Sequence, residues 1–150
     1  IDDKVAQITS QISKNPRLRK CVFNFQRDIA YNIPKGFFGS ILNGRDITHR
    51  IIPDATFKFY VTASILERSR RRYKELKKLG RKVTFKKIIK SLKKRDKSDK
   101  NREKQSGKLL KTKDSILINT THLSITECFL KVKKIIDRKL NNYGNNFKTK

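Results

Sequence analysis

The chain has 150 residues, which is enough for one domain with a hydrophobic core. Only 35% of its residues are hydrophobic and its formal net charge is +26, a balance that raises the question of disorder. The apolar residues recur at helical or strand-like spacing, which argues against disorder for most of the chain. No run has membrane-spanning length or the pattern of a signal peptide, so the sequence predicts a cytoplasmic protein without a membrane partner.

The positive charge is concentrated in one segment. Residues 68–113 hold 22 Lys and Arg against 4 Asp and Glu, so +18 of the +26 lies there. Such a field attracts a polyanion, whether nucleic acid, an anionic membrane or nucleotide phosphates. Because an AT-rich coding sequence would by itself favour lysine, the arginines are the better guide to function.

The first third of the chain predicts two amphipathic helices. Residues 2–13 carry apolar side chains at helical spacing. Asn15-Pro16 then has the form of a helix start, with Asn as the N-cap and Pro in the first turn. The apolar face that follows consists of Leu18, Val22, Phe25 and Ile29. Arg19 and Arg27 lie beside it, and the simplest interpretation is that they are solvated cations.

Two strand-like runs follow. The apolar residues from Phe37 to Leu42 predict a strand covered on both faces, with Arg45 and Asp46 at its carboxyl end. Ligands bind at that edge of open α/β sheets, but the periodicity by itself favours a strand that ends in a solvated charged turn. Residues 57–61 predict a second strand.

The basic segment predicts a pair of helices. Ser64 and Glu67 form a capping box, and Gly80 marks the end of the first helix. Its arginines Arg68, Arg71 and Arg72 share a face, which is either solvated or a phosphate site. The second helix is capped by Thr84, and it carries Arg95, Asp99 and Arg102 at i, i+4 and i+7. That face is either an ion-pair ladder or a site for a phosphate and a hydroxyl or amino group.

The last part of the chain completes an α/β pattern. Residues 103–113 predict a loop, residues 115–119 a third strand, and Ser124 with Glu127 a second capping box before a terminal helix. Residues 141–150 predict a polar tail. The alternation of strands and helices indicates an α/β domain with a parallel sheet.

Other chemistry is sparse. The cysteines Cys21 and Cys128 and the histidines His49 and His122 lie far apart, so the sequence predicts no disulfide framework and no metal site. Gly39 and Gly44 have the spacing of a phosphate loop, but no Lys-Ser/Thr follows, and we interpret the match as accidental.

In this order the pieces resemble bacterial cytidylate kinase, a nucleoside monophosphate kinase. The resemblance covers residues 1–140, and two of its motifs are specific: Gly44-Arg45-Asp46 before Pro53-Asp54-Ala55, and Arg95-Asp96-x-x-Asp99-x-Asn101-Arg102. It also includes Asn15-Pro16-Arg17-x-Arg19 and Thr120-Thr121-x-Leu123-Ser124-Ile125. The implied fold is that of P-loop-type nucleoside monophosphate kinases, a parallel sheet flanked by helices.

The resemblance implies transfer of the γ-phosphate of ATP, with Mg²⁺, to CMP or dCMP in pyrimidine metabolism. The positions that match the family's monophosphate site are Ser10, Arg19, Arg45, Asp46, Arg95, Asp99 and Arg102. The segment 68–86 is similar to the lid over ATP, with Arg68, Arg71 and Arg72 as its cations. Arg71, Arg72 and Arg95 would stabilise the migrating phosphoryl group.

The chain departs from the family in three places, one of which is the loop at residues 103–113, which is longer than expected and lacks the family's Ala-Pro pair. The chain contains neither the family's first strand nor its glycine-rich phosphate loop, so it resembles the C-terminal part of a cytidylate kinase and is expected to be inactive alone. Thr48-His49-Arg50 replaces the usual small residue after Asp46. The resemblance suggests a monomer with no dedicated nucleic-acid partner. The alternative is a basic RNA-binding or ribosome-associated protein without enzymatic activity.

Overall fold

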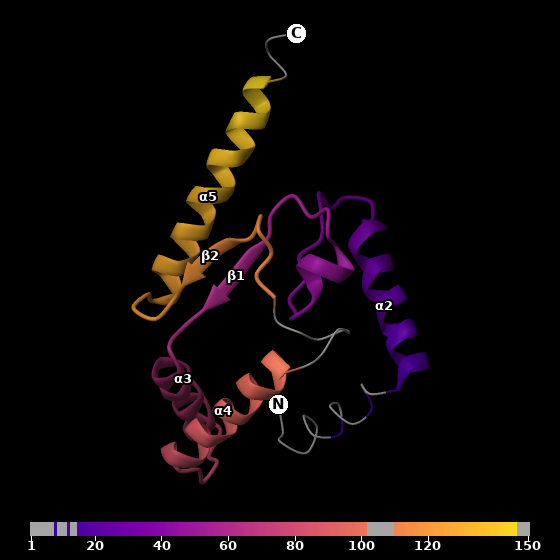
Figure 1. The fold of residues 1–150 in the computed structure, drawn as a ribbon. Helices are drawn as coiled ribbons and strands as arrows, with labels where there is room; N and C mark the ends of the chain where they lie inside the picture. The colour runs from indigo at the N-terminus through magenta and orange to yellow at the C-terminus, as the bar shows by residue number, and fades with distance from the viewer. Residues whose placement is uncertain (1–7, 9–11, 13–14, 102–109, 147–150) are drawn as a thin grey trace. The chain divides into compact units, whose positions relative to one another are not determined.

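The computed structural model describes residues 8, 12, 15–101 and 110–146. Its elements in chain order are α2 (Pro16–Tyr31), η1 (Ile47–Ile51), β1 (Phe59–Thr62), α3 (Ile65–Lys78), α4 (Phe85–Asn101), β2 (Ile116–Asn119) and α5 (Ile125–Asn146) (Figure 1). They fall into two compact units, residues 1–55 with 104–110 and residues 56–103 with 111–150. Each unit is described by itself.

The second unit is built on a small parallel sheet. β1 pairs with β2 in a register that places Phe59 opposite Ile116 and Thr62 opposite Asn119. The ladder is extended at both ends, because Ile116 N–H donates to the Lys58 carbonyl and Thr120 N–H to the Thr62 carbonyl, each at 2.8 Å. Both strands were predicted from their apolar runs, and the structure confirms the parallel sheet.

The prediction of a strand over residues 37–42 is wrong. These residues have no regular structure, and the side chains of Phe38 and Ile41 are fully exposed. A strand needs a neighbour for its backbone and cover for its faces, and neither strand that the structure describes pairs with this run. The segment is instead tied to α2, where the Ser40 hydroxyl donates to the Ala30 carbonyl at 2.9 Å.

The helix pair α3–α4 follows its sequence signals closely. Ser64 caps α3 by accepting a hydrogen bond from Glu67 N–H at 3.2 Å, and Thr84 caps α4 through Lys87 N–H at 3.4 Å. Gly80 ends the first helix with a φ of +69°, a conformation that only glycine adopts easily. Leu76 and Ile88 are buried between the helices.

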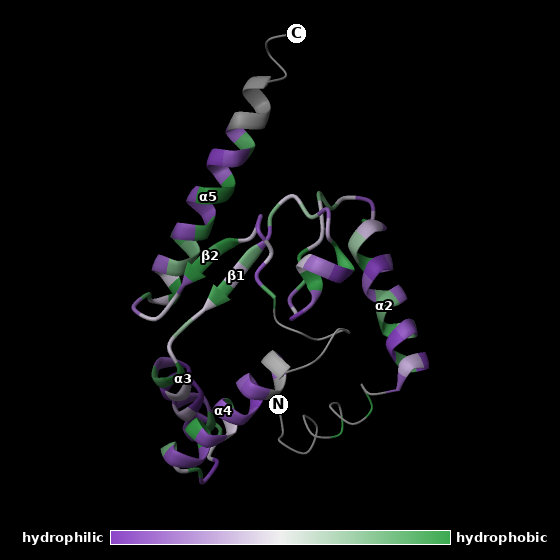
Figure 2. Ribbon diagram, in the orientation of Figure 1, coloured by the Kyte–Doolittle hydropathy of each residue, from purple (hydrophilic) through white to green (hydrophobic). Residues whose placement is uncertain are grey.

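Helix α5 begins at the second capping box and runs further than predicted. Ser124 Oγ accepts from Glu127 N–H at 3.1 Å, and Ser124 N–H donates to Glu127 Oε2 at 2.7 Å. The helix continues to Asn146, into the segment predicted as a polar tail. Polar and apolar residues alternate along it, as Figure 2 shows, and among the described helices none is long and apolar enough to cross a membrane.

Candidate functional site

One group of the predicted site residues lies in the first unit, in the turn that carries Arg45 and Asp46. Both side chains are half-buried, and they immediately precede η1. η1 is a single π-helical turn, in which Ile51 N–H donates to the Asp46 carbonyl at 3.3 Å and Ile52 N–H to the Ile47 carbonyl at 2.8 Å. π-turns are uncommon and frequently lie at functional sites, because the wider turn re-aims neighbouring side chains.

Arg27 of α2 holds this turn in place. Its Nη1 donates to the Ile51 carbonyl at 2.9 Å, and its guanidinium lies over the rings of Phe23 and Tyr31, 5.7 and 4.7 Å from their centroids. A guanidinium over an aromatic face is attracted by the ring quadrupole. Arg50, from η1 itself, also lies over the ring of Phe23, 5.3 Å from its centroid. Helix α2, which also carries the half-buried Arg19, is thereby fixed to the Arg45–Asp46 turn.

A second contact anchors the C-terminal end of α2. The Tyr31 hydroxyl donates to Oδ1 of Asp54, which follows η1 in the chain. This hydrogen bond to a carboxylate raises the pKa of Tyr31 above its ordinary value, because it stabilises the protonated phenol. The carboxylate of the Pro53-Asp54-Ala55 motif is therefore engaged in the packing of the first unit.

A second group of the predicted site residues lies in the second unit, on α4. Arg95 is exposed and Asp99, one turn later, is only 8% exposed. A carboxylate with so little exposure is held by partners rather than by water. The remaining predicted residues, Ser10 and Arg102, lie outside the described residues.

Two arginines of the predicted lid make contacts in different directions. Arg68 donates through Nη1 and Nη2 to the two carboxylate oxygens of Asp96 on α4, at 2.9 and 2.7 Å, and its Nε donates to the Ala63 carbonyl at 3.0 Å. Arg71 reaches the end of β2, where its guanidinium donates to the Thr120 carbonyl at 2.6 Å and to the Thr120 hydroxyl at 3.1 Å. Arg68 and Arg71 therefore join α3 to two different neighbours.

Arg72 pairs with a residue of its own helix. Its Nη1 lies 2.7 Å from Oε1 of Glu75, and this partner lowers the pKa of the Glu75 carboxyl. The assignment of these three arginines to ATP remains a prediction, and it requires their guanidiniums to exchange protein partners for phosphate oxygens.

The predicted site residues thus form two groups. Arg19, Arg45 and Asp46 belong to the first unit, and the second unit holds Arg68, Arg71, Arg72, Arg95 and Asp99. The sequence placed Arg27 beside the apolar face of α2 as a solvated cation, and its contacts with the η1 backbone and two aromatic rings were not predicted. The signal was present, since Phe23, Arg27 and Tyr31 recur every four residues along one face of α2.

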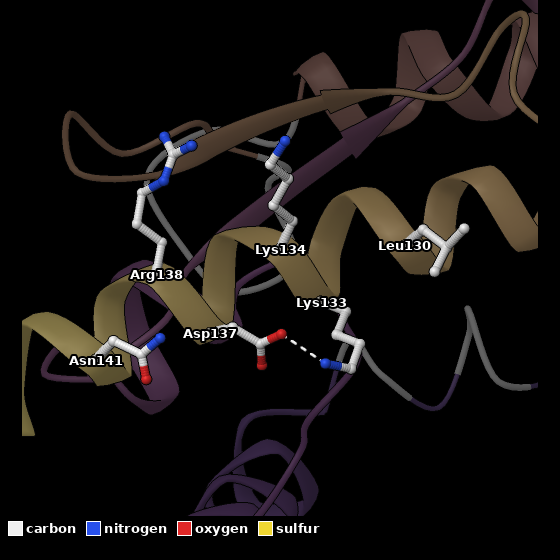
Figure 3. Close-up of a pocket in the computed structure, with 6 residues that line it drawn as sticks. All are labelled: Leu130, Lys133, Lys134, Asp137, Arg138 and Asn141. Atoms are coloured by element: carbon white, nitrogen blue, oxygen red, sulfur yellow. Dashed lines mark hydrogen bonds and ion pairs between the residues drawn. The ribbon is translucent and has the colours of Figure 1, made fainter.

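A hollow of about 640 Å³ lies elsewhere, along one face of α5 (Figure 3). It contains none of the predicted site residues, and its lining is Leu130, Lys133, Lys134, Asp137, Arg138 and Asn141. Lys133 and Asp137 pair with each other across one helical turn, so the two charges largely cancel. The described part of the chain also shows no group of three His, Cys, Asp or Glu residues that could hold a metal ion.

The sequence model of the Cytidylate kinase family matches residues 1–138. The chain is 39% identical over 134 residues to the cytidylate kinase of Bartonella bacilliformis. The aligned residues make up 89% of this chain and 60% of that protein. It is 38% identical over 136 residues to the cytidylate kinase of Carboxydothermus hydrogenoformans, an alignment that covers 91% of this chain and 58% of that protein. It is 37% identical over 136 residues to the cytidylate kinase of Brucella ovis, where the alignment covers 91% of this chain and 59% of that protein. The chain spans about three-fifths of the length of these relatives. With both arginine–aspartate motifs inside the matched region, the chain belongs to the cytidylate kinase family.

Proposed function

We propose that the chain binds CMP or dCMP and presents it for phosphoryl transfer from ATP, with CDP or dCDP as the product. The observation that carries the proposal is the family match over residues 1–138, which contains Arg45-Asp46 and Arg95-x-x-x-Asp99 together. Arginine forks suit phosphate oxygens, because they donate two parallel hydrogen bonds. The carboxylates suit the amino group of cytosine or the hydroxyls of the sugar, which are hydrogen-bond donors.

Arg45, Arg95, Arg102 and Arg19 would hold the phosphate of the monophosphate, while Asp46, Asp99 and Ser10 would read the sugar and the base. Arg71, Arg72 and Arg95 would offset negative charge on the migrating phosphoryl group, with Arg68 beside them in the lid. In such reactions positioning and electrostatic stabilisation provide most of the catalysis. Mg²⁺ would arrive with ATP as part of the substrate, because this ion is held largely by phosphates and water.

The 150 residues contain no Gly-x-x-x-x-Gly-Lys-Ser/Thr sequence, whose backbone N–H groups cradle ATP phosphates in this class of enzyme. We therefore expect residues 1–150 by themselves to bind the monophosphate without turning it over. Formation of CDP by the purified 150-residue chain from CMP and Mg·ATP would contradict this expectation.

The test of the proposed function is calorimetric titration of the chain with CMP, dCMP and UMP. We expect CMP to bind more tightly than UMP. Asp99→Asn should lower the ratio of the CMP affinity to the UMP affinity by about tenfold or more, since a hydrogen bond to a charged group contributes roughly 1.5–3 kcal/mol. Arg95→Lys should weaken all three ligands together, because a single ammonium cannot form the two-pronged contact.

Asp137→Asn provides the control, because it removes an equal charge from α5, away from both motifs. Equal binding of all three nucleotides by the unmodified chain, or an equal effect of Asp99→Asn and Asp137→Asn, would overturn the assignment.

A further inference from the structure

The helix pair α3–α4 uses its two kinds of cation differently. All four arginines of α3 are in ion pairs with acidic residues of the pair: Arg68 with Asp96, Arg70 and Arg71 with Glu67, and Arg72 with Glu75. The lysines are exposed, and within the described residues they form no ion pair. They are Lys74, Lys77, Lys78, Lys82, Lys86, Lys87, Lys90, Lys93, Lys94 and Lys97.

Four of these lysines form a straight row on α4. Lys86, Lys90, Lys93 and Lys97 stand at i, i+4, i+7 and i+11, which places them within one narrow stripe of the helix surface. Ile88 lies on the opposite side of the helix and is buried, and Asp96, which lies between these two sides, is bound to Arg68. At a rise of 1.5 Å per residue the stripe is about 16 Å long. We call it the α4 lysine stripe.

We propose that the α4 lysine stripe is a binding surface for the phosphate backbone of nucleic acid, independent of base sequence. Charge complementarity selects a polyanion, because the acidic side chains of the helix pair are turned to its arginines or buried, as Asp99 is. The stripe is longer than the phosphate chain of one nucleotide. A row of evenly spaced point charges suits a row of phosphates, and it gives affinity without sequence readout.

An anionic membrane fits this surface less well. Basic helices that bind membranes insert bulky apolar side chains beside their cations. Along α4 the large apolar residues are directed elsewhere, with Ile88 buried and Phe85 packed edge-on against Tyr73 at 5.8 Å between ring centroids. The stripe therefore offers charge without an apolar anchor. The stripe contains none of the residues assigned to the monophosphate, so the inference stands whether or not the proposed kinase function is correct.

The experiment is fluorescence anisotropy of a labelled RNA and a labelled DNA, each about 20 nucleotides long, titrated with the 150-residue chain between about 50 and about 300 mM NaCl. The test variant carries Lys86→Gln, Lys90→Gln, Lys93→Gln and Lys97→Gln. The control carries Lys35→Gln, Lys113→Gln, Lys131→Gln and Lys134→Gln, four exposed lysines outside the helix pair, so the two variants have the same net charge.

We expect the test variant to lose at least about tenfold in affinity at fixed salt, and its log–log salt slope to be smaller by about 3, as four lost phosphate contacts predict. The control should change affinity by less than about threefold, because only diffuse charge is lost. Circular dichroism should show equal helix content in both variants, since glutamine and lysine have similar helix propensity.

Three results would overturn the proposal. These are an equal loss of affinity in both variants, no salt-dependent binding by the unmodified chain, and tighter binding to phosphatidylserine vesicles than to either nucleic acid. The last would identify the surface as a membrane contact instead.

Discussion

The guanidinium of Arg68 and the carboxylate of Asp96 join α3 to α4 through two parallel contacts, 2.9 Å from Nη1 to Oδ1 and 2.7 Å from Nη2 to Oδ2. This fork fixes the relative rotation of the two side chains, which a single contact would leave free. The same contact raises the pKa of Arg68, because the hydrogen bond to Asp96 stabilises the charged guanidinium. Helix α3, which carries most of the segment that resembles a lid, is thus joined to α4 by a bidentate ion pair.

Arg68→Lys should lower the free energy of unfolding by about 1 kcal/mol, since lysine keeps the charge but loses the fork. We keep the value small because both side chains are about a third exposed, at 35% and 36%, and water screens the pair. Urea denaturation measures the change.

Arg70→Lys is the matched control for this experiment. Arg70 lies 3.7 Å from Glu67 and is 59% exposed, so this substitution should leave stability nearly unchanged. Equal effects of the two substitutions would show that the fork adds nothing to an ordinary surface pair.

Gly44→Ala should destabilise the first unit by about 1–2 kcal/mol, through overpacking. A Cβ at position 44 would stand 2.8 Å from Cγ1 and 2.9 Å from Cδ1 of Ile47, which is buried at the start of η1. Because Arg45 is the next residue, the affinity for CMP should fall as well, and urea denaturation with CMP titration measures both effects.

Gly39→Ala controls for the loss of glycine's freedom in the unfolded chain. A Cβ at that position meets no atom within 4 Å, so Gly39→Ala should be neutral or slightly stabilising. If both variants behaved alike, the contact with Ile47 would not be the reason for glycine at position 44.

The sequence predicted best the features that depend on a few neighbouring residues. The caps Asn15, Ser64 and Ser124 each accept the expected backbone hydrogen bond, and Gly80 ends α3 as predicted. Such signals act within one helical turn, so they can be recognised without knowledge of the tertiary structure.

Residues 37–42 show where this reasoning ends. An apolar run becomes a strand only when another strand pairs with it, and that partner is not encoded in the run itself. The arginines of α3 pose the same problem, because helical spacing placed Arg68 and Arg71 on one face but could not predict that one contacts Asp96 and the other Thr120. A long side chain can pair with any suitable group close to it, and the packing of the helices and strands determines which groups are close.

Asp54→Asn should return the pKa of Tyr31 toward its ordinary value, because the hydrogen bond to the carboxylate is the largest cause of the increase. The raised pKa means that folding favours the protonated phenol, so this contribution to stability is present below about pH 10 and is lost as the pH rises further. Carbon-13 NMR of the tyrosine Cζ atoms follows the titration. Asp28→Asn, on the exposed side of α2, should leave Tyr31 unchanged, and an equal shift in both variants would contradict the assignment.

Asp114 gives the chain a specific sensitivity to acid. Its carboxylate accepts a hydrogen bond from the ammonium of Lys58, whose side chain is only 9% exposed at the start of β1, and this contact lowers the pKa of Asp114 to about 2. A lowered pKa means that folding favours the ionised carboxylate. The resulting stability is present above the unfolded pKa of about 3.9 and is lost as the pH falls through about 2.

Asp114→Asn should therefore lower stability at neutral pH and flatten its decline between about pH 4 and pH 2, since asparagine does not ionise. Urea midpoints measured across this range check the prediction. Asp137→Asn removes an ion pair between two exposed side chains of α5, and it should leave the slope in this window much closer to that of the unmodified chain. If Asp114→Asn kept the full acid dependence, the Lys58–Asp114 contact would not be the group that acid disrupts, and the parallel sheet would owe its acid sensitivity to other carboxylates.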